Sequence, residues 1–492
     1  MSIWKKAIFI ILIAVYLYFR LGPILNHTVP YTYDQGRDFL KASEMVENLK
    51  PTFIGPTTGI MGLFHGAWWY YLLVIPRLLF NGLPIGYYYF MFALSLLANL
   101  AFFFFIKKEF DDLTALFYLS LISASPYLIP ISFTAANNAV VPNILLLFIA
   151  VSVILLKKKK LAKYWLFILG LTLGFVFEFE VAFGMFLIPV FFITALVIPL
   201  IRQKIYNLKS IPLIIIGILI PFLPRALFEL KNHFLQSKTI IGFITAPKLF
   251  NPKPYNLVFI DRIGAFMGYL KSIPFGEFYP TIIFLSILTA TAFFVYRKKE
   301  KTTSQILTFF LCLTLFLFLI SLVYRDNFWS NYFEGIQYFF IFIFLLGYSI
   351  FSKQNKVIAT VILLIFIGVN GYAIYNNLST KPVKKIYGLA EQEAVFNYVQ
   401  NKTDKNDFCL RIYTPPVIPH TYIYLMNYYS RVEGYKISSY DYRNNKCFYI
   451  IESDPYRFRV TEWRKDNTPK NAVLTDKKVV TPNVTVEEWT LK

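Results

Sequence analysis

Charged residues are scarce in this chain. Asp, Glu, Lys and Arg make up 16% of its 492 residues, and hydrophobic residues make up 57%. A soluble domain carries about 25% charged residues. Apolar runs of about 20 residues recur, and each is long enough to cross a hydrocarbon core of about 30 Å. The composition excludes an ordinary soluble domain and predicts a polytopic α-helical membrane protein.

Acidic residues are the scarcer of the two charge types, with 28 Asp and Glu against 49 Lys and Arg. In a soluble protein this excess would indicate a nucleic-acid partner. Here the cations stand in short runs between apolar segments, which is the pattern that orients membrane helices. We therefore expect membrane lipids as partners and no nucleic acid.

Cysteine and several catalytic motifs are also lacking. Three cysteines do not form a disulfide framework, and the sequence leaves open whether Cys409 and Cys447 pair in the polar C-terminal region. The chain has no GxxxxGK[ST] phosphate loop, no HExxH zinc helix and no GxSxG elbow. Nothing indicates ATP hydrolysis, so any chemistry must use a substrate that is already energised.

The basic runs predict the topology. Placing them in the cytoplasm gives about 11 membrane-spanning helices, with the N-terminus inside and the C-terminus outside. The runs are Lys5-Lys6, Lys107-Lys108, Lys157 to Lys160 with Lys163, Arg202 to Lys209, Arg297 to Lys301, and Lys353 with Lys356. Trp68 to Phe80 is left out as a span because it is short and contains Pro76 and Arg77. We expect residues 66–81 to dip into the outer face of the membrane and return.

This topology defines two domains. Residues 1–375 form a transmembrane domain with a first outer loop at 26–83 and a long outer loop at 229–277. Residues 376–492 are polar and are expected to form a small extracytoplasmic α/β domain. Its predicted helices are 389–400 and 419–429, and its predicted strands are 408–413, 447–451 and one or two within 479–490.

The first outer loop carries the densest group of charges. Asp34 and Asp38 lie one turn apart if this stretch is helical, with Arg37 beside them. One interpretation is a solvated surface with an incidental ion pair. The other is an active site.

Other ionisable residues stand at expected outer ends of helices, where charge near hydrocarbon is costly without a partner or a role. Glu178 and Glu180 either reach solvent or point into a cavity that binds a cation or a sugar hydroxyl. His65 is either a packing residue or, with Glu180, a candidate ligand for a divalent metal. The sequence does not establish that a metal is required.

Two arginines have comparable alternatives. Arg225 either pairs with Glu229 at i, i+4 or binds a lipid phosphate. Arg325, beside Asp326, has the same two interpretations.

The order of motifs in the first outer loop resembles the GT-C membrane glycosyltransferases. The stretches are Tyr33-Asp-Gln-Gly-Arg-Asp38, Ile54-Gly-Pro-Thr-Thr58 and Phe64-His-Gly-Ala-Trp-Trp-Tyr-Tyr71. The branch they resemble contains the protein O-mannosyltransferases and the lipid A aminoarabinose transferases. The family pattern has Glu where this chain has Gln35.

The resemblance implies a GT-C fold and a hexosyl- or pentosyltransferase that uses a polyprenyl-phosphate sugar as donor. The acceptor, whether protein, lipid or polysaccharide, is not defined. The resemblance implies that Asp34 is the general base and that Asp38 supplies any second carboxylate. It places Gln35, Arg37, His65, Glu178, Glu180, Arg225 and Arg325 among the expected substrate-binding residues.

Two other classes of protein predict different features. A transporter or lipid flippase predicts charges at mid-span and inverted repeats, whereas these spans are nearly charge-free at their centres and show no repeat. A non-catalytic membrane scaffold that presents residues 376–492 remains an alternative on the sequence alone.

Overall fold

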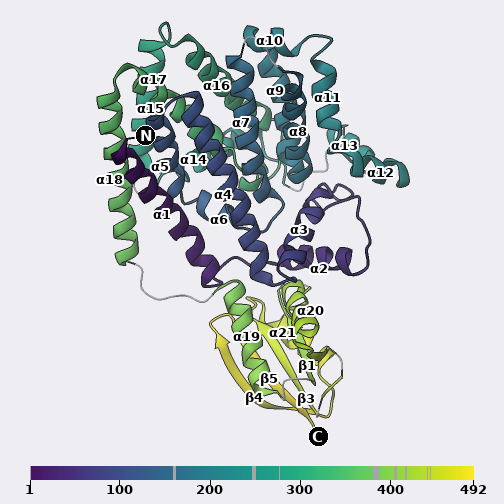
Figure 1. Cartoon of the computed structure of the whole chain (residues 1–492). Helices are drawn as coiled ribbons and strands as arrows, with labels where there is room; N and C mark the ends of the chain where they lie inside the picture. The colour runs from purple at the N-terminus through teal and green to yellow at the C-terminus, as the bar shows by residue number, and fades with distance from the viewer. Residues whose placement is uncertain are drawn as a thin grey trace. The chain divides into compact units, whose positions relative to one another are not determined.

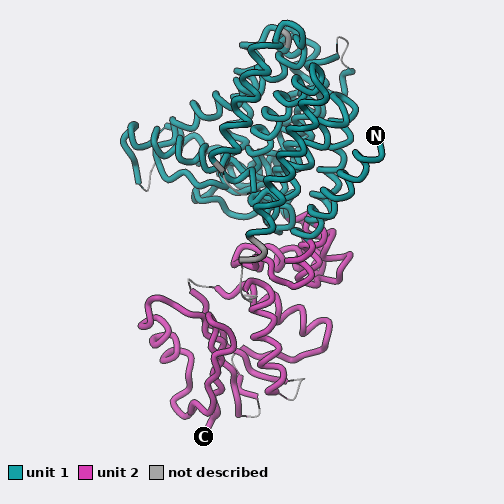
Figure 2. The backbone as a smooth tube through the Cα atoms, turned by 90° about the vertical axis from the view of Figure 1, so that its left-hand side faces the viewer, with its two compact units in different colours: residues 1–20, 52–69, 91–382 teal, residues 21–51, 70–90, 383–492 magenta. Residues whose placement is uncertain are grey.

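The computed structural model describes residues 2–158, 162–245, 251–275, 278–380, 387–403, 407–415, 418–439, 441–443 and 445–492. Lys159, Lys160 and parts of the predicted long outer loop (246–250 and 276–277) lie outside the described residues. The chain divides into two compact units (Figure 2). Unit 1 comprises residues 1–20, 52–69 and 91–382, and unit 2 comprises residues 21–51, 70–90 and 383–492.

Unit 1 is helical (Figure 1). Its helices, some of which begin or end in unit 2, are α1 (Ile3–Leu25), α3 (Trp68–Leu79), α4 (Pro84–Glu109), α5 (Asp112–Ser123), α6 (Leu128–Ile131), α7 (Val141–Lys157), α8 (Lys163–Phe179), α9 (Val181–Val197), α10 (Pro199–Ile205), α11 (Ile211–Leu219), α12 (Leu223–Lys231), α13 (Leu235–Thr245), α14 (Tyr255–Lys271), α15 (Phe278–Tyr296), α16 (Lys301–Ser321), α17 (Gln337–Gln354) and α18 (Lys356–Thr380), with 3₁₀ turns η1 (Asn138–Val140) and η2 (Ser330–Phe333).

Among the described residues, six helices are long and apolar enough to cross a membrane. The pair α11 and α12, bent by 64°, passes the same test together and adds a seventh candidate if the pair is one span. The chain is thus a multi-pass membrane protein. The number of helices that cross the bilayer, about 11 from the sequence, stays a prediction. The 12-residue α3 rises only about 18 Å and is not among the candidate spans, as expected for the segment at 66–81.

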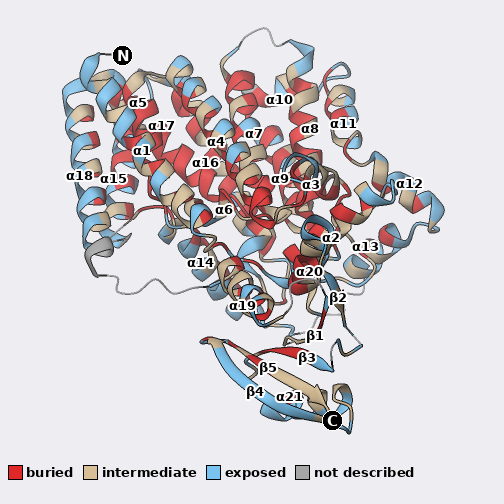
Figure 3. Ribbon diagram, turned by 60° about the horizontal axis from the view of Figure 1, so that its bottom comes forward, coloured by how far each residue is buried: buried red, intermediate tan, exposed pale blue. Residues whose placement is uncertain are grey.

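The interior of unit 1 is lined by aromatic and aliphatic side chains. Helix α17 is buried along nearly its whole length, whereas one face of α18 is exposed (Figure 3). Phe117 stacks on Tyr348 with ring centroids 4.2 Å apart, which joins α5 to α17. An exposed apolar face on a span such as α18 suits contact with lipid tails.

Unit 2 is built around a five-stranded sheet with the order β2-β1-β3-β5-β4. The strands are β1 (Asp407–Tyr413), β2 (Lys436–Ser438), β3 (Lys446–Glu452), β4 (Ala472–Thr481) and β5 (Val484–Leu491), and the helices after residue 388 are α19 (Leu389–Lys402), α20 (His420–Glu433) and α21 (Arg457–Asn467). Strand β1 is parallel to β2 and β3, whereas β5 is antiparallel to β3 and β4.

Alternation along β1 separates the two faces of this sheet. Cys409 packs in a cluster with Val460 and Trp463 of α21. The neighbouring Phe408 meets Phe396 of α19, which stacks on Tyr429 of α20. Helix α21 therefore covers one face, and α19 and α20 cover the other. The predicted elements of this region are all present, and α21 and β2 are additional.

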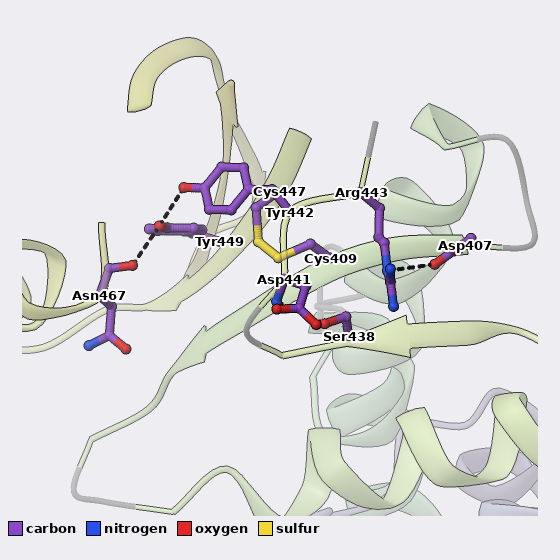
Figure 4. Close-up of a disulfide and its surroundings, with 9 residues drawn as sticks. All are labelled: Asp407, Cys409, Ser438, Asp441, Tyr442, Arg443, Cys447, Tyr449 and Asn467. Carbon is purple, nitrogen blue, oxygen red and sulfur yellow. Dashed lines mark hydrogen bonds and ion pairs between the residues drawn. A yellow bond between two sulfur atoms is a disulfide. The ribbon is translucent and has the colours of Figure 1, made fainter. Parts of the chain in front are cut away.

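Cys409 and Cys447 form a disulfide between β1 and β3 (Figure 4). Both cysteines are fully buried. Beside them, the Tyr442 and Tyr449 hydroxyls lie 2.9 Å apart, and Tyr449 donates to the Asn467 carbonyl. The pairing that the sequence left open is therefore made.

Unit 2 also contains the helix of the first outer loop, α2 (Tyr33–Glu47). The chain before it is tied to α19, because Leu389 and Ala390 donate backbone hydrogen bonds to the carbonyls of Val29 and His27. The His27 Nδ1 atom lies 2.6 Å from Glu393 Oε2. Residues distant in sequence thus form one compact unit.

Candidate functional site

The first turn of α2 presents the charged motif. The Gln35 side chain accepts a hydrogen bond from the Thr32 backbone N–H at 2.7 Å, as the N3 residue of a capping box does. Gln35 is 3% exposed, so its side chain stabilises the start of the helix. The Thr-x-x-Gln spacing from Thr32 to Gln35 is the sequence signal for this cap. The substrate-binding role of Gln35 stays a prediction.

Arg37 joins the two carboxylates of the motif. Its Nη1 lies 2.8 Å from Asp34 Oδ1, and its Nη2 lies 2.9 Å from Asp38 Oδ1. The Asp34 side chain is 68% exposed and that of Asp38 is 3% exposed. Burial lowers the pKa of Arg37, but Asp38 and Asp34 outweigh it and the pKa is raised, which keeps the guanidinium charged. The motif therefore offers one exposed carboxylate, that of Asp34. Arg37 pairs with it and is held in place by the buried Asp38.

Helix α2 packs closely on α20 within unit 2. A Cβ atom on Gly36 would lie 2.4 Å from the Thr421 backbone nitrogen, so glycine permits this approach. The Tyr33 ring lies 4.6 Å from the His420 ring. Burial, and then the charge of Arg37, lower the pKa of His420, while Asp34 opposes the shift. His420 is a neighbour of the motif that the sequence did not single out.

A second polar cluster lies in unit 1. Arg225 Nε donates to Glu178 Oε1 at 2.7 Å, and Arg225 Nη1 donates to the Phe64 carbonyl at 2.9 Å and to the Gln236 side chain. The side chains of Arg225 and Glu178 are 8% and 0% exposed. A Cβ on Gly66 would meet Glu178 Oε2 at 2.0 Å, so this glycine lets the first outer loop approach α8.

Two of the alternatives that the sequence left open for these residues are wrong. Arg225 does not pair with Glu229, because Glu178 reaches it from α8; Glu229 instead accepts from the backbone N–H groups of Gln236 and Ser237. The interpretation of Glu178 and Glu180 as solvated carboxylates also fails, since both are buried. Each lies at the α8–α9 junction, where neighbouring helices exclude solvent.

Glu180, Arg325 and His65 are the remaining candidates of unit 1. Glu180 accepts from the Ala182 backbone N–H at 3.3 Å. Arg325 Nε donates to the Lys253 carbonyl at 3.0 Å, and its guanidinium lies 4.9 Å from the Tyr255 ring centre. The His65 backbone N–H donates a hydrogen bond to the Pro56 carbonyl, and the His65 carbonyl accepts one from the Gly55 N–H.

Another buried carboxylate, Glu334, was not singled out from the sequence. It accepts from Asn138 Nδ2 at 2.7 Å and from the Tyr127 hydroxyl. Within the described ranges, no group of three or more His, Cys, Asp or Glu side chains could hold a metal ion.

No protein-family model matches the chain, and no curated protein is similar to it in sequence. Solved structures do match. ArnT from Cupriavidus metallidurans bound to undecaprenyl phosphate gives a TM-score of 0.57 at 10% identity, over 99% of this chain and 98% of ArnT. The apo form of that protein gives the same TM-score and identity over 99% and 97%. The Archaeoglobus fulgidus oligosaccharyltransferase with zinc and sulfate gives a TM-score of 0.48 at 11% identity, over 88% and 62%.

The chain thus has the GT-C fold, which the motifs of the first outer loop predicted. Within this fold, the structure matches ArnT, a lipid A aminoarabinose transferase, over almost the full length of both chains.

Proposed function

We propose that this chain is an integral membrane glycosyltransferase that moves a sugar from a polyprenyl-phosphate donor to an acceptor on the extracytoplasmic side. The observation that carries the proposal is the exposed Asp34 carboxylate, held by Arg37 at the start of α2 in a chain with the GT-C fold. The ArnT structure with the same fold holds undecaprenyl phosphate.

The Cys409–Cys447 disulfide supports an extracytoplasmic location of the C-terminal region. Disulfides persist in oxidising compartments and are rare in the cytosol. A disulfide after the last apolar helix agrees with a C-terminal region outside the cytoplasm. The basic runs predict the same orientation.

In the proposed reaction, Asp34 accepts the proton of an acceptor hydroxyl. The acceptor oxygen forms a bond to the anomeric carbon while the bond from that carbon to the phosphate oxygen breaks, and polyprenyl phosphate leaves with the electron pair. General base catalysis of this kind contributes about 10²- to 10⁴-fold. Asp38 and Arg37 position Asp34, because Asp38 is buried and lies 2.9 Å from Arg37.

Arg225 is the best-supported group for the lipid phosphate. Its Nη2 atom is buried and has no hydrogen-bond partner among the described residues, as is also true of Gln236 Nε2. Buried donors are normally satisfied, and a guanidinium suits phosphate oxygens. An anion that reached Nη2 would satisfy it while Nε and Nη1 keep their contacts with Glu178 and Phe64.

The test is transfer from a radiolabelled polyprenyl-phosphate sugar in membranes that contain the wild type or Asp34→Asn. We expect transfer to be lost in this variant at normal expression. Asp466→Asn, which changes an exposed carboxylate on α21, is the matched control and should transfer normally. Retained transfer in Asp34→Asn would remove Asp34 from the mechanism.

A further inference from the structure

A groove of about 850 Å³ lies between α2 and α20, entirely within unit 2. Its α2 wall begins at Arg37, which holds Asp34. Its α20 wall belongs to the domain that follows the last apolar helix. The residues that line it are Arg37, Leu40, Lys41, Ser43, Glu44, Glu47, Asn48, Tyr70, His420, Tyr424, Asn427, Tyr428, Ser430 and Arg431.

The charges of this groove are paired with one another. Lys41 Nζ lies 2.9 Å from Glu44, and Arg431 Nη1 lies 2.9 Å from Glu47. Arg37 is occupied by its two aspartates. Since the described lining residues carry no uncompensated cluster of one sign, the groove suits a neutral ligand better than a phosphate or a charged peptide.

The hydrogen-bonding groups that stay available are uncharged. The side chains of Asn427, Tyr428 and Ser430 have no hydrogen-bond partner in the part of the chain that the structure describes, and the His420 ring lines the groove beside them. An amide, two hydroxyls and an imidazole can both donate and accept. Tyrosine rings beside them offer the apolar faces on which a ring with hydroxyl groups can rest.

We propose that the α2–α20 groove binds the sugar of the acceptor, so that α20 selects which hydroxyl-bearing sugar receives the transferred one. This proposal rests on the proposed function. The acceptor fits better than the donor because Leu40 is the only aliphatic side chain among the described lining residues, whereas a polyprenyl chain is aliphatic throughout. The low pKa of His420 agrees with a neutral imidazole that hydrogen-bonds a hydroxyl.

Binding is tested on the full chain in lipid nanodiscs, without any donor, so that the result does not depend on transfer. The probes are methyl glycosides of glucose, galactose, mannose, glucosamine and arabinose, detected by saturation-transfer NMR. We expect at least one to bind. Asn427→Ala and Tyr428→Phe should each raise the Kd of the bound glycoside about fivefold to tenfold, because each variant loses a hydrogen bond to the sugar. Val432→Ala, an exposed α20 position outside the groove, is the control and should bind like the wild type.

Three results would overturn the proposal. The first is that none of these glycosides binds, and the second is that both groove variants keep the wild-type Kd. The third is that another ligand displaces the glycoside. Displacement by a polyprenyl-phosphate sugar would assign the groove to the donor, and displacement by inorganic phosphate would assign it to an anion. If one of these results is found and Asp34→Asn still loses transfer, the groove proposal fails and the proposed function stands. If a glycoside binds as expected but the wild type transfers no sugar, the proposed function fails and the groove remains a sugar-binding site.

Discussion

Arg37 Nη1 lies 2.8 Å from Asp34 Oδ1, and the same guanidinium contacts the buried Asp38. The planar fork of arginine can hold two carboxylates at once, whereas a lysine ammonium is a single flexible point charge. The exposed carboxylate of Asp34 is thus oriented by an ion pair between the half-buried Arg37 and the buried Asp38.

We predict that Arg37→Lys impairs transfer while the protein still folds. The lysine keeps the charge but loses the bridging geometry, and a misplaced catalytic group can cost up to about 100-fold in rate. Steady-state kinetics with a polyprenyl-phosphate sugar should show a lower kcat with little change in the donor KM. An unchanged kcat would show that Asp34 does not depend on Arg37.

The Arg225–Glu178 pair predicts a large loss of stability when one partner is removed. Arg225→Met leaves the buried Glu178 carboxylate without its cation, and breaking a buried pair in this way costs about 3–5 kcal/mol. Unfolding in detergent should show a strong decrease in Tm. The double variant Arg225→Met with Glu178→Gln should recover part of it, and equal losses in both variants would contradict the pairing.

Removal of the disulfide should destabilise the C-terminal sheet. Cys409 and Cys447 are 38 residues apart, and closing a loop of this length is worth about 4 kcal/mol in the chain-entropy account. Cys409→Ser with Cys447→Ser should therefore become sensitive to limited proteolysis after residue 388. Cys312→Ser, which removes the free cysteine, is the matched control and should resist proteolysis as the wild type does.

The His27–Glu393 contact predicts a pH dependence. The hydrogen bond to Glu393 raises the pKa of His27 above its ordinary value. A raised folded-state pKa contributes stability that is fully present below the unfolded pKa of about 6.5 and is lost as the pH rises through the raised value. Unfolding measured between about pH 5.5 and 9 should show this decrease. In His27→Gln the contribution should vanish, and an identical pH profile in the two proteins would contradict it.

Local patterns explain how much of unit 2 was predictable. The mainly apolar stretches from Phe408 to Tyr413 and from Cys447 to Ile451 were predicted as strands, and β1 and β3 are present there. Helix α21 was missed because its sequence is rich in charge and Val460 is its one buried residue among those described. A helix with so narrow an apolar contact gives little periodic signal.

Partners that come from distant segments were not predictable in the same way. Pairing with Glu229 was one of the two alternatives for Arg225, because i, i+4 neighbours meet on a helix. The residue it contacts, Glu178, is 47 positions away and is brought to it by the packing of α8 on α11, the helix that precedes α12. The close approach of α2 to α20 at Gly36 likewise depends on tertiary packing. The groove lined by His420 depends on the same packing.

The most direct test of the central claim separates donor binding from transfer in Asp34→Asn. With purified protein, the variant should bind a polyprenyl-phosphate sugar with wild-type affinity while transfer falls by about 10²- to 10⁴-fold. Transfer at the wild-type rate in Asp34→Asn would contradict the account, because the exposed carboxylate of α2 would then not be the base.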